Sequence, residues 1–420
     1  MVGPRPGLAI LLMEWALAST FLISQKAINH DKVKLKAIIM SWIPALDEFD
    51  DEQTRIYNDI VDDVKRSWWI KGYAGTGKTM MLVHLAHAYM EAGYDCAYVT
   101  YTHALKNLVN EALLELGDEQ ASLSIFTVDS LNSGGRRYDI VLVDEVQDLP
   151  AKKIKKLLTI GERFIFAGDL NQSIFLNSAK PSVIKKLLGN PVVVELRDIH
   201  RLPEAISFAS HLIFPEAEAA ENAQVNVIRD SSVNVVEATS SAAEVEWVYD
   251  QALKESRQTK PSAILFSKHS ELQKFVEILC SAKQVGEPPS VKKMIIGGGH
   301  DYNPINKFLK KNKMHLMYFG GAGGGEISLA TKAKMVLMMT LHSAKGLEFG
   351  SVFMPFMDSD HLPCPYPPLK NDDTWQRRFV YVGVTRTKLN FYASYSKSEH
   401  EILDRLNDEN LDGYLNHLSV

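Results

Sequence analysis

The stretch WWIKGYAGTGKT, residues 68–79, joins an apolar strand pattern to a glycine-rich turn, and a helical pattern follows directly. Gly72, Gly77, Lys78 and Thr79 have the spacing of a P-loop. In such a loop the backbone N–H groups bind phosphates, the lysine reaches the β- and γ-phosphate oxygens, and the hydroxyl binds Mg²⁺. The helix N-terminus adds a positive dipole end. Because a strand precedes the loop and a helix follows it, the stretch predicts a nucleoside triphosphate site rather than a chance match.

The composition is that of an ordinary globular protein. The 420 residues are 46% hydrophobic and 23% charged, and this length predicts two domains. The net charge of −5 argues against broad coating of nucleic acid, although a local basic groove is compatible with it. Cys96, Cys280 and Cys364 lie far apart and lack metal-ligand spacing. We therefore expect a cytoplasmic protein without structural disulfides.

The apolar run Leu8–Ile23 has two interpretations. It resembles a signal peptide or membrane anchor, but Glu14 interrupts it and the run is shorter than a membrane-spanning helix needs. A helix that packs on the protein, or an extension with little order, fits these features better. We assign residues 1–45 to an N-terminal extension and expect no membrane partner.

Short apolar β-type runs alternate with helical patterns along the rest of the chain. This alternation predicts an α/β fold with parallel sheets flanked by helices. We place one domain at residues 46–215 and a second at 216–420, joined near the Ala/Glu-rich stretch 217–223. The runs are Cys96–Tyr101, Leu123–Phe126, Ile140–Val143, Phe164–Phe166 and Val192–Val194, and then Ala263–Phe266, Met335–Thr340, Val352–Phe356 and Phe391–Tyr395.

Polar residues directly follow two of these runs. The run 140–143 leads into Asp144 and Glu145, and the run 164–166 leads into a turn that contains Gln172. Ligands bind at the carboxyl ends of strands in open α/β sheets. Asp144 is therefore suited to Mg²⁺, Glu145 to orienting and deprotonating a water molecule, and Gln172 to sensing the γ-phosphate. The alternative is that these residues only form turns.

Five blocks in this order resemble the motifs of the UvrD-like superfamily 1 helicases. The resemblance extends from about Phe49 to Tyr395, and several ordered blocks are more specific than any one of them. It implies two RecA-like P-loop domains that clamp ATP and Mg²⁺ between them. The blocks are residues 72–79, 144–148, 168–174, 340–349 and 381–386.

The resemblance also implies roles at the ATP site. Gln53, whose amide matches the N6/N7 edge of adenine, is assigned to the base, with a plain surface-helix position as the alternative. Arg201 joins Gln172 at the γ-phosphate, and Arg386 is the arginine finger supplied by the second domain. The remaining nucleotide contacts are assigned to Gly72, Ala74, Gly75, Thr76, Gly77, Lys78, Thr79 and Glu348, with Thr79 and Asp144 as the metal ligands.

Single-stranded DNA is the partner that the resemblance implies, lying across both domains. Tyr101 has two open interpretations, as a ring that stacks on a base and as an ordinary strand aromatic. Hydroxyl and imidazole groups are suited to phosphate contacts. The assigned nucleic-acid residues are Tyr101, Thr102, His103, Ser130 and Phe175 in the first domain and Thr340 and His342 in the second.

The chain departs from the family pattern in three places. Asn177 stands where the family usually has a base-stacking tryptophan, which leaves Phe175 as the candidate replacement. Asp129 stands where a histidine is usual. The intervals between Ser130 and Asp144 and between Arg201 and Thr340 are short, so we expect the accessory domain of the first domain to be missing and that of the second to be missing or vestigial.

The resulting hypothesis is an ATP-dependent DNA helicase or single-strand DNA translocase, moving 3′ to 5′ by analogy with the family. The missing insertions predict poor unwinding by the chain alone and the need for a protein partner or self-association. The alternative is a DNA-sensing ATPase switch that regulates a nuclease in repair or phage defence without unwinding. A small-molecule kinase is disfavoured because Arg201 and Arg386 would then have no purpose.

Overall fold

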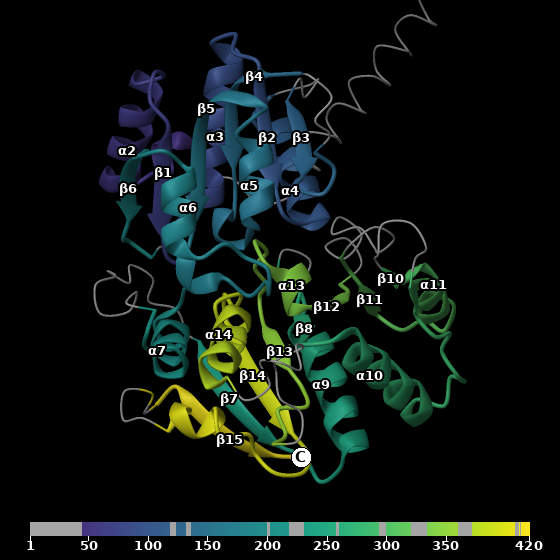
Figure 1. Cartoon of the computed structure of the whole chain (residues 1–420). Helices are drawn as coiled ribbons and strands as arrows, with labels where there is room; N and C mark the ends of the chain where they lie inside the picture. The colour runs from purple at the N-terminus through teal and green to yellow at the C-terminus, as the bar shows by residue number, and fades with distance from the viewer. Residues whose placement is uncertain are drawn as a thin grey trace, which may run out of the picture. The chain divides into compact units, whose positions relative to one another are not determined.

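The computed structural model divides the chain into two units, residues 1–44 and 45–420 (Figure 1). The structure describes residues 44–117, 123–131, 136–199, 202–217, 231–257, 260–293, 300–320, 334–359, 372–407, 411 and 413–420. The expected N-terminal extension, with its apolar run, therefore lies almost wholly outside the described residues, as do Arg201, Cys364 and most of the expected linker. Among the described residues, no helix is both long and apolar enough to cross a membrane.

Six parallel strands form the first sheet, in the order β3-β2-β4-β5-β1-β6. Trp69 of β1 pairs with Phe166 of β5 on one side and Val193 of β6 on the other. Because all strands run the same way, the residues that follow them meet at one edge of the sheet. The strands are β1 (Trp68–Gly72), β2 (Cys96–Thr100), β3 (Ser124–Thr127), β4 (Tyr138–Val143), β5 (Gly161–Gly168) and β6 (Val192–Leu196).

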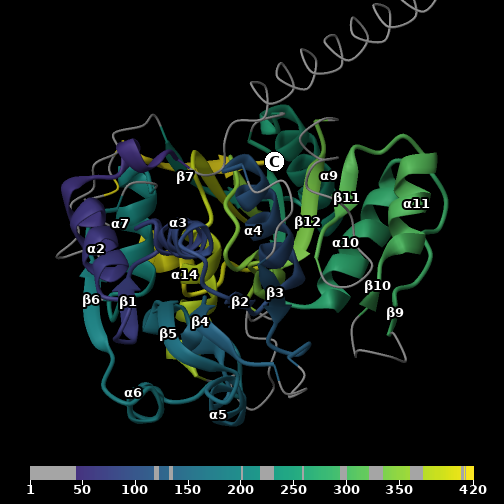
Figure 2. The ribbon, with the colours of Figure 1, turned by 90° about the horizontal axis from the view of Figure 1, so that it is seen from above.

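Helices cover both faces of the first sheet. The helix α3 contacts α2 and α4, while α5 contacts α6, and Figure 2 shows the two groups on opposite sides of the strands. Burial on both faces explains the continuous apolar runs in β2 and β4, every residue of which is buried except Asp139. The helices are α2 (Asp51–Asp62), α3 (Lys78–Glu91), α4 (His103–Glu115), α5 (Ala151–Leu157) and α6 (Pro181–Leu187).

Seven parallel strands form the second sheet, in the order β11-β12-β8-β13-β14-β7-β15. Its core includes Phe353, whose ring stacks on that of Tyr392 at a centroid distance of 4.5 Å. The strands are β7 (Ser232–Glu237), β8 (Ala263–Phe266), β11 (Leu316–Tyr318), β12 (Val336–Thr340), β13 (Val352–Met354), β14 (Asn390–Tyr395) and β15 (Leu415–Ser419).

The helices around the second sheet form two groups. The helix α9 (Ser241–Glu255) contacts α10 (His269–Ala282), and α7 (Glu204–Ile213) contacts α14 (Asp373–Val384). The helix α7 also contacts β7, although it precedes the domain boundary expected at residue 215. That boundary stays a prediction.

Between α10 and β12 the described chain adds only small elements. They are a two-stranded antiparallel pair, β9 (Lys292–Lys293) and β10 (His300–Asp301), the helix α11 (Asn303–Lys311), and β11. Between β3 and β4 the described residues contain no helix or strand. Both sheets, with their flanking helices, confirm the predicted α/β fold class with parallel strands.

Candidate active site

The P-loop connects the end of β1 to the start of α3. Gly77 has a φ of 88°, in the left-handed region that favours glycine, and it immediately precedes the helix. Lys78 is 9% exposed, and its Nζ donates to the carbonyl oxygens of Gly72, at 2.9 Å, and Tyr73, at 2.6 Å. Burial lowers the pKa of Lys78, while Asp169, Glu145 and Asp144 act in the opposite direction. The lysine is therefore held inside the loop by carbonyl groups, among carboxylates.

The other loop residues pack closely around that turn. Ala74 and Thr76 are buried, Gly75 has a φ of 81°, and the Thr76 hydroxyl donates to the Tyr73 carbonyl at 3.0 Å. A Cβ on Gly72 would lie 2.6 Å from Oγ1 of Thr76 and 2.9 Å from a backbone oxygen of Leu196. Only glycine fits at position 72 without a shift of the neighbouring backbone.

Gln53 reaches the P-loop from α2. Its side chain takes part in a capping box with Asp50 at the start of α2, and its Nε2 donates to the Thr76 carbonyl at 3.2 Å. A Cβ on Gly77 would lie 2.8 Å from that same Nε2. Gln53 is 5% exposed, so its amide faces the loop and is not a surface-helix side chain.

Asp144 and Thr79 form the candidate metal site. The Thr79 hydroxyl donates to Oδ2 of Asp144 at 2.8 Å, and the Tyr98 hydroxyl donates to the same oxygen at 3.1 Å. Burial, followed by repulsion from Glu145, raises the pKa of Asp144 to about 6. A carboxylate and a hydroxyl are the oxygen donors that Mg²⁺ prefers, and a cation there would offset the buried negative charge.

Glu145 lies in an unusual backbone conformation. Its φ is 53°, in the left-handed region, which costs a non-glycine residue about 1–3 kcal/mol and is found mainly at functional sites. The side chain is 7% exposed and accepts a hydrogen bond from Nε2 of Gln147. Burial opposes ionisation, but Lys345, Lys78 and Arg386 outweigh it and lower the pKa of Glu145. Glu145 is therefore an anion at neutral pH, able to accept a proton.

Gln172 is the point at which residues of the two sheets meet. Its Nε2 donates to Oδ2 of Asp169 at 2.8 Å, and its Oε1 accepts from Nη2 of Arg386, also at 2.8 Å. Arg386 follows α14 and is 5% exposed, with further bonds to the carbonyls of Val382 and Leu347. The predicted finger and the predicted sensor thus touch directly.

Oε2 of Glu348 forms an ion pair with Nζ of Lys388 at 2.9 Å, and the Glu348 side chain is partly buried. It precedes Phe349, whose N–H donates to the Arg386 carbonyl at 2.9 Å. Its backbone is therefore close to the finger. Arg201, the other residue predicted at the γ-phosphate, lies outside the described residues.

Three rings from separate segments pack against one another, and we call this group the ring stack: Tyr101, Phe175 and His342. The Phe175 centroid lies 4.1 Å from that of Tyr101 and 4.8 Å from that of His342. The first pair is tilted, with an interplanar angle of 42°, and the second is edge-to-face, at 67°. Burial lowers the pKa of His342 to about 4, so its ring is neutral at pH 7. Phe175 and Asn177 both follow η3 (Leu170–Gln172), but Asn177 is exposed, and Phe175 is the residue that takes part in the stack.

The remaining predicted nucleic-acid residues have local structural partners or face solvent. The Thr102 hydroxyl accepts from Leu105 N at 3.2 Å and caps α4, and the Thr340 hydroxyl accepts from Ser343 N at 3.3 Å and caps α13 (Leu341–Ala344). His103 is exposed. Ser130 is also exposed, and its hydroxyl donates to the Thr127 carbonyl at 2.9 Å.

Lys345 and Asp148 form an ion pair that the sequence did not predict. Lys345 is 2% exposed and Asp148 is fully buried, and the two join the segment after α13 to η2 (Val146–Asp148). Burial raises the pKa of Asp148 to about 7, although Lys345 acts in the opposite direction. Within the described residues, Oδ1 of Asp148 accepts no hydrogen bond.

Asp169 and Tyr98 are further residues that the sequence reasoning missed. Asp169 lies inside the block 168–174, and its carboxylate orients Gln172. Tyr98 lies on β2 beside β4, and only the strand pairing brings it to Asp144. The position of Asp169 at the end of a strand could have indicated a site residue, whereas nothing in the sequence around Tyr98 did.

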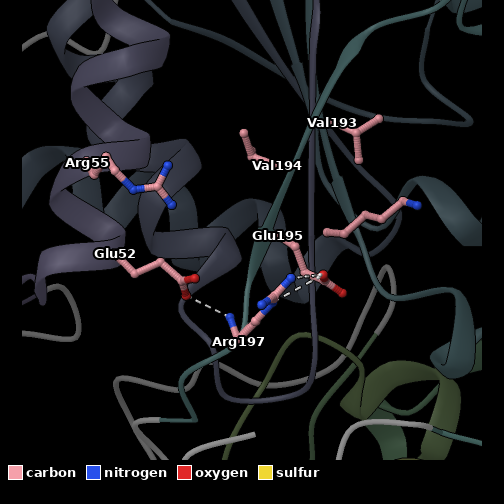
Figure 3. Close-up of a pocket in the computed structure, with 7 residues that line it drawn as sticks. Glu52, Arg55, Val193, Val194, Glu195 and Arg197 are labelled. Atoms are coloured by element: carbon pink, nitrogen blue, oxygen red, sulfur yellow. Dashed lines mark hydrogen bonds and ion pairs between the residues drawn. The ribbon is translucent and has the colours of Figure 1, made fainter. Parts of the chain in front are cut away.

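A pocket of about 450 Å³ lies beside the site, between α2 and the edge strand β6 (Figure 3). Glu52 and Arg55 project into it from α2, and Glu52 accepts from Arg197 N at 2.8 Å. The same helix thus presents Gln53 to the P-loop and its neighbours to this pocket. The lining residues are Glu52, Arg55, Lys71, Val193, Val194, Glu195 and Arg197.

Two protein-family models match the chain. The model of the UvrD-like helicase C-terminal domain matches residues 251–398. The model of an AAA domain matches residues 48–235. Together they cover the P-loop, the acidic strand end and the segments that carry Lys345 and Arg386.

Curated relatives are similar over shorter stretches. DNA helicase II of Haemophilus influenzae is 40% identical over 77 residues, which are 18% of this chain and 10% of that protein. ATP-dependent DNA helicase Rep of Buchnera aphidicola subsp. Schizaphis graminum is 42% identical over 64 residues, 15% of this chain and 10% of that protein. These matches support a UvrD-like superfamily 1 helicase.

The chain spans only a small part of the length of the curated relatives it matches. DNA helicase II of Rickettsia typhi is 29% identical over 102 residues, which are 24% of this chain and 14% of that protein. Among solved structures, Arterivirus nonstructural protein 10, a helicase, aligns with a TM-score of 0.42 and 16% identity, over 84% of this chain and 64% of that one.

Proposed function

We propose that the chain is an ATP hydrolase that moves along single-stranded DNA, with ATP bound between the two sheets. The observation that carries this proposal is the 2.8 Å hydrogen bond from Arg386 to Gln172. The two residues come from different sheets, so hydrolysis that needs both of them depends on how the sheets are held together. Such dependence couples phosphate chemistry to domain movement.

ATP is the substrate that the P-loop residues fit. Residues 72–79 would surround the phosphates, with Lys78 leaving the carbonyls of Gly72 and Tyr73 to contact phosphate oxygens. Gln53 would face the adenine, since its amide already borders the loop at Thr76. Glu348 is proposed as a further nucleotide contact. Thr79 and Asp144 would hold Mg²⁺, which would supply positive charge to offset the charge that develops on the phosphates.

Hydrolysis needs a base for the attacking water, and Glu145 is the proposed base. Three cations keep its carboxylate ionised despite burial, and Gln147 orients one of its oxygens. Gln172, held by Asp169, would position the water or the γ-phosphate. Arg386 would stabilise the negative charge that develops on the transferred phosphoryl group, together with Arg201.

DNA is proposed to lie along the ring stack, where stacking on aromatic faces gives grip without sequence preference. Tyr101 and Phe175 would contact bases from the first sheet's side, and His342 from the second. Thr102, His103, Ser130 and Thr340 are proposed phosphate contacts. The Thr102 hydroxyl caps a helix by accepting, so its proton is left to donate to phosphate. The Thr340 hydroxyl caps α13 and also shares a hydrogen bond with Oγ of Ser343 at 3.1 Å.

Several finer statements extend the proposal. Movement from 3′ to 5′, a partner protein or self-association, and a role in repair or antiviral defence follow from the family resemblance and the short insertions. We also propose that residues 46–215 and 216–420 are the two RecA-like domains, and that the protein acts in the cytoplasm.

ATP turnover with and without oligo(dT), followed by strand displacement on 3′-tailed and 5′-tailed duplexes, tests the proposal. We expect turnover to rise with single strands, and weak displacement of the 3′-tailed substrate by the monomer. Equal turnover with single strand, duplex and no DNA would contradict the motor. Stimulation without displacement at any concentration, or with any tail, would favour the DNA-sensing switch.

A further inference from the structure

Lys345 has contacts near both the proposed ATP site and the proposed DNA site. Its Nζ forms the buried ion pair with Asp148 and lies 5.9 Å from the centroid of the Phe175 ring. It is also the first of the cations that lower the pKa of Glu145. One side chain of the second sheet therefore pairs with the turn beside the proposed base and lies near the proposed base-stacking ring.

The turn held by Lys345 is bonded directly to Glu145. Asp148 N donates to the Glu145 carbonyl at 3.0 Å, and Gln147 Nε2 donates to the Glu145 carboxylate. On its other side, Oε1 of Gln147 fills the space above Gly168 where an added Cβ would lie 2.2 Å away. A displacement of Asp148 therefore acts on both the backbone and the side chain of Glu145.

The segment that carries Lys345 also contacts the ring stack. His342 lies in α13, one helical turn before Lys345, and its ring packs against Phe175. Gly346 follows Lys345, and a Cβ there would lie 3.0 Å from Leu105 of α4. Figure 1 shows α13 on the side of the second sheet that faces the first. The segment 342–346 is therefore held by the packing of the His342 ring, by the ion pair of Lys345 and by the close approach of Gly346 to Leu105.

We propose that Lys345 is a positioning residue that transmits DNA occupancy of the ring stack to Glu145 through its ion pair with Asp148. A base that enters between Phe175 and His342 moves α13, and Lys345 moves with it. The ion pair pulls η2, which reorients Glu145 toward the water. This inference rests on the proposed function, because it requires DNA at the ring stack and hydrolysis at Glu145.

The physical chemistry favours a link over a purely stabilising contact. A buried ion pair contributes little net stability, because desolvation of two charges offsets their attraction. Its apolar replacement is often neutral or stabilising, whereas removal of one partner is strongly destabilising. An ion pair that adds little stability but joins a segment of each sheet, Lys345 after α13 and Asp148 in η2, fits a role as a link between them.

The test replaces both partners at once, with Lys345→Met and Asp148→Leu in one chain, so that no buried charge is left unpaired. The readout is the stimulation ratio, the turnover with saturating oligo(dT) divided by the turnover without it. We expect this ratio to fall by about tenfold. Fluorescence anisotropy with labelled oligo(dT) should give a Kd close to that of the wild type, and thermal melting should stay cooperative.

Two further variants separate transmission from structure. Arg377→Met is the matched control, because it removes a buried cation that pairs with Asp373 at 2.7 Å and with Glu216, away from the ring stack. It should keep the wild-type ratio. Asp148→Asn retains the shape and an acceptor for Lys345, so it decides the question if the double variant does not fold, and we expect its ratio to fall by at least about threefold.

The outcomes distinguish this inference from the proposed function. A wild-type protein that no strand stimulates would overturn both. A stimulated wild type and an unchanged ratio in the folded double variant, or in Asp148→Asn, would overturn the inference alone. Both rates falling together with the ratio preserved would make the ion pair structural.

Discussion

The two sheets contribute different kinds of group to the candidate active site. The first sheet supplies hydroxyl, amide and carboxylate groups that already bond to one another, as in the pairs Thr79–Asp144 and Gln172–Asp169. The second supplies buried cations, Lys345 and Arg386, whose acceptors include Asp148 and Gln172 of the first. The first half of the site is therefore assembled within one sheet, and the second half is complete only when both sheets are in contact.

This difference would let the proposed site bind ATP before the groups needed for hydrolysis are in place. Under the proposed function, binding would depend on the P-loop, which is built from a single strand–turn–helix unit. Hydrolysis would depend on groups that cross between the sheets. Substitutions on the two sides should therefore separate nucleotide affinity from turnover.

The largest expected effect comes from the second sheet's contribution. Arg386→Ala should reduce DNA-stimulated ATP turnover by about 10³–10⁵-fold, because an arginine finger stabilises charge only in the transition state. Nucleotide affinity, measured with a fluorescent ATP analogue, should change little. Arg378→Ala is the control, since Arg378 also reaches the first sheet's side but donates to the Ser173 carbonyl at 3.3 Å. A loss of less than about tenfold for Arg386→Ala would make that residue structural.

The next effect belongs to the first sheet. Glu145→Gln should lower turnover by about 10²–10⁴-fold, because general-base catalysis contributes that much, while ATP binding persists. Lys78→Ala should instead weaken ATP binding itself. Single-turnover kinetics and equilibrium binding of both variants check the distinction. Near-normal turnover in Glu145→Gln would contradict its assignment as the base.

A smaller effect is expected where both sides meet at the ring stack. Phe175→Ala should weaken oligo(dT) binding by roughly 5–150-fold, because stacking is worth about 1–3 kcal/mol per base. Leu176→Ala is the control, since Leu176 is 46% exposed and lies next in the chain. Anisotropy titrations at several salt concentrations measure both, with an expected slope of about −0.7 per neutralised phosphate. Equal affinities for the two variants would remove Phe175 from the DNA site.

The smallest effect compares two helix caps, one from each sheet. Thr102→Ala and Thr340→Ala should each lower the free energy of unfolding by about 0.5–2 kcal/mol, because each removes an N-cap acceptor. Thr→Ser at either position keeps the acceptor and should restore most of the loss. Urea unfolding of all four variants gives the comparison. If the alanine variants match the wild type, the hydroxyls serve ligand binding rather than capping.

Much of the fold could be predicted because its central strands are buried on both faces. The runs 140–143 and 263–266 are apolar throughout, and both became central strands. The strands β7, β11 and β15 were not predicted. β15 contains Asn416 and His417, both exposed on the sheet edge, so it has no continuous apolar run. β11 is apolar throughout but has only three residues. β7 carries Asn234, a buried polar residue that interrupts the pattern.

The site could be predicted only where its chemistry is local in sequence. The P-loop and the acidic pair carry their spacing with them, and the structure brings Thr79 and Asp144 together as expected. The ion pair of Lys345 joins residues 197 positions apart, and nothing in either block indicates the partner. The role of Gly72 and Gly77 in letting the backbone bind phosphates stays a prediction. The sequence did not indicate the close contacts that the structure adds there, with Thr76 and Leu196 at Gly72 and with Gln53 at Gly77.

The left-handed backbone at Glu145 has a consequence for sequence drift at this position. Glycine would adopt the same φ without the steric conflict, which amounts to about 1–3 kcal/mol for a non-glycine residue. Pressure for stability alone therefore favours glycine, and pressure for hydrolysis favours glutamate. A descendant of this chain that binds DNA but no longer turns over ATP would be expected to lose the carboxylate here first and to melt at a higher temperature afterwards. Glu145→Gly thus measures how much fold stability the chain forgoes to keep a base at this position.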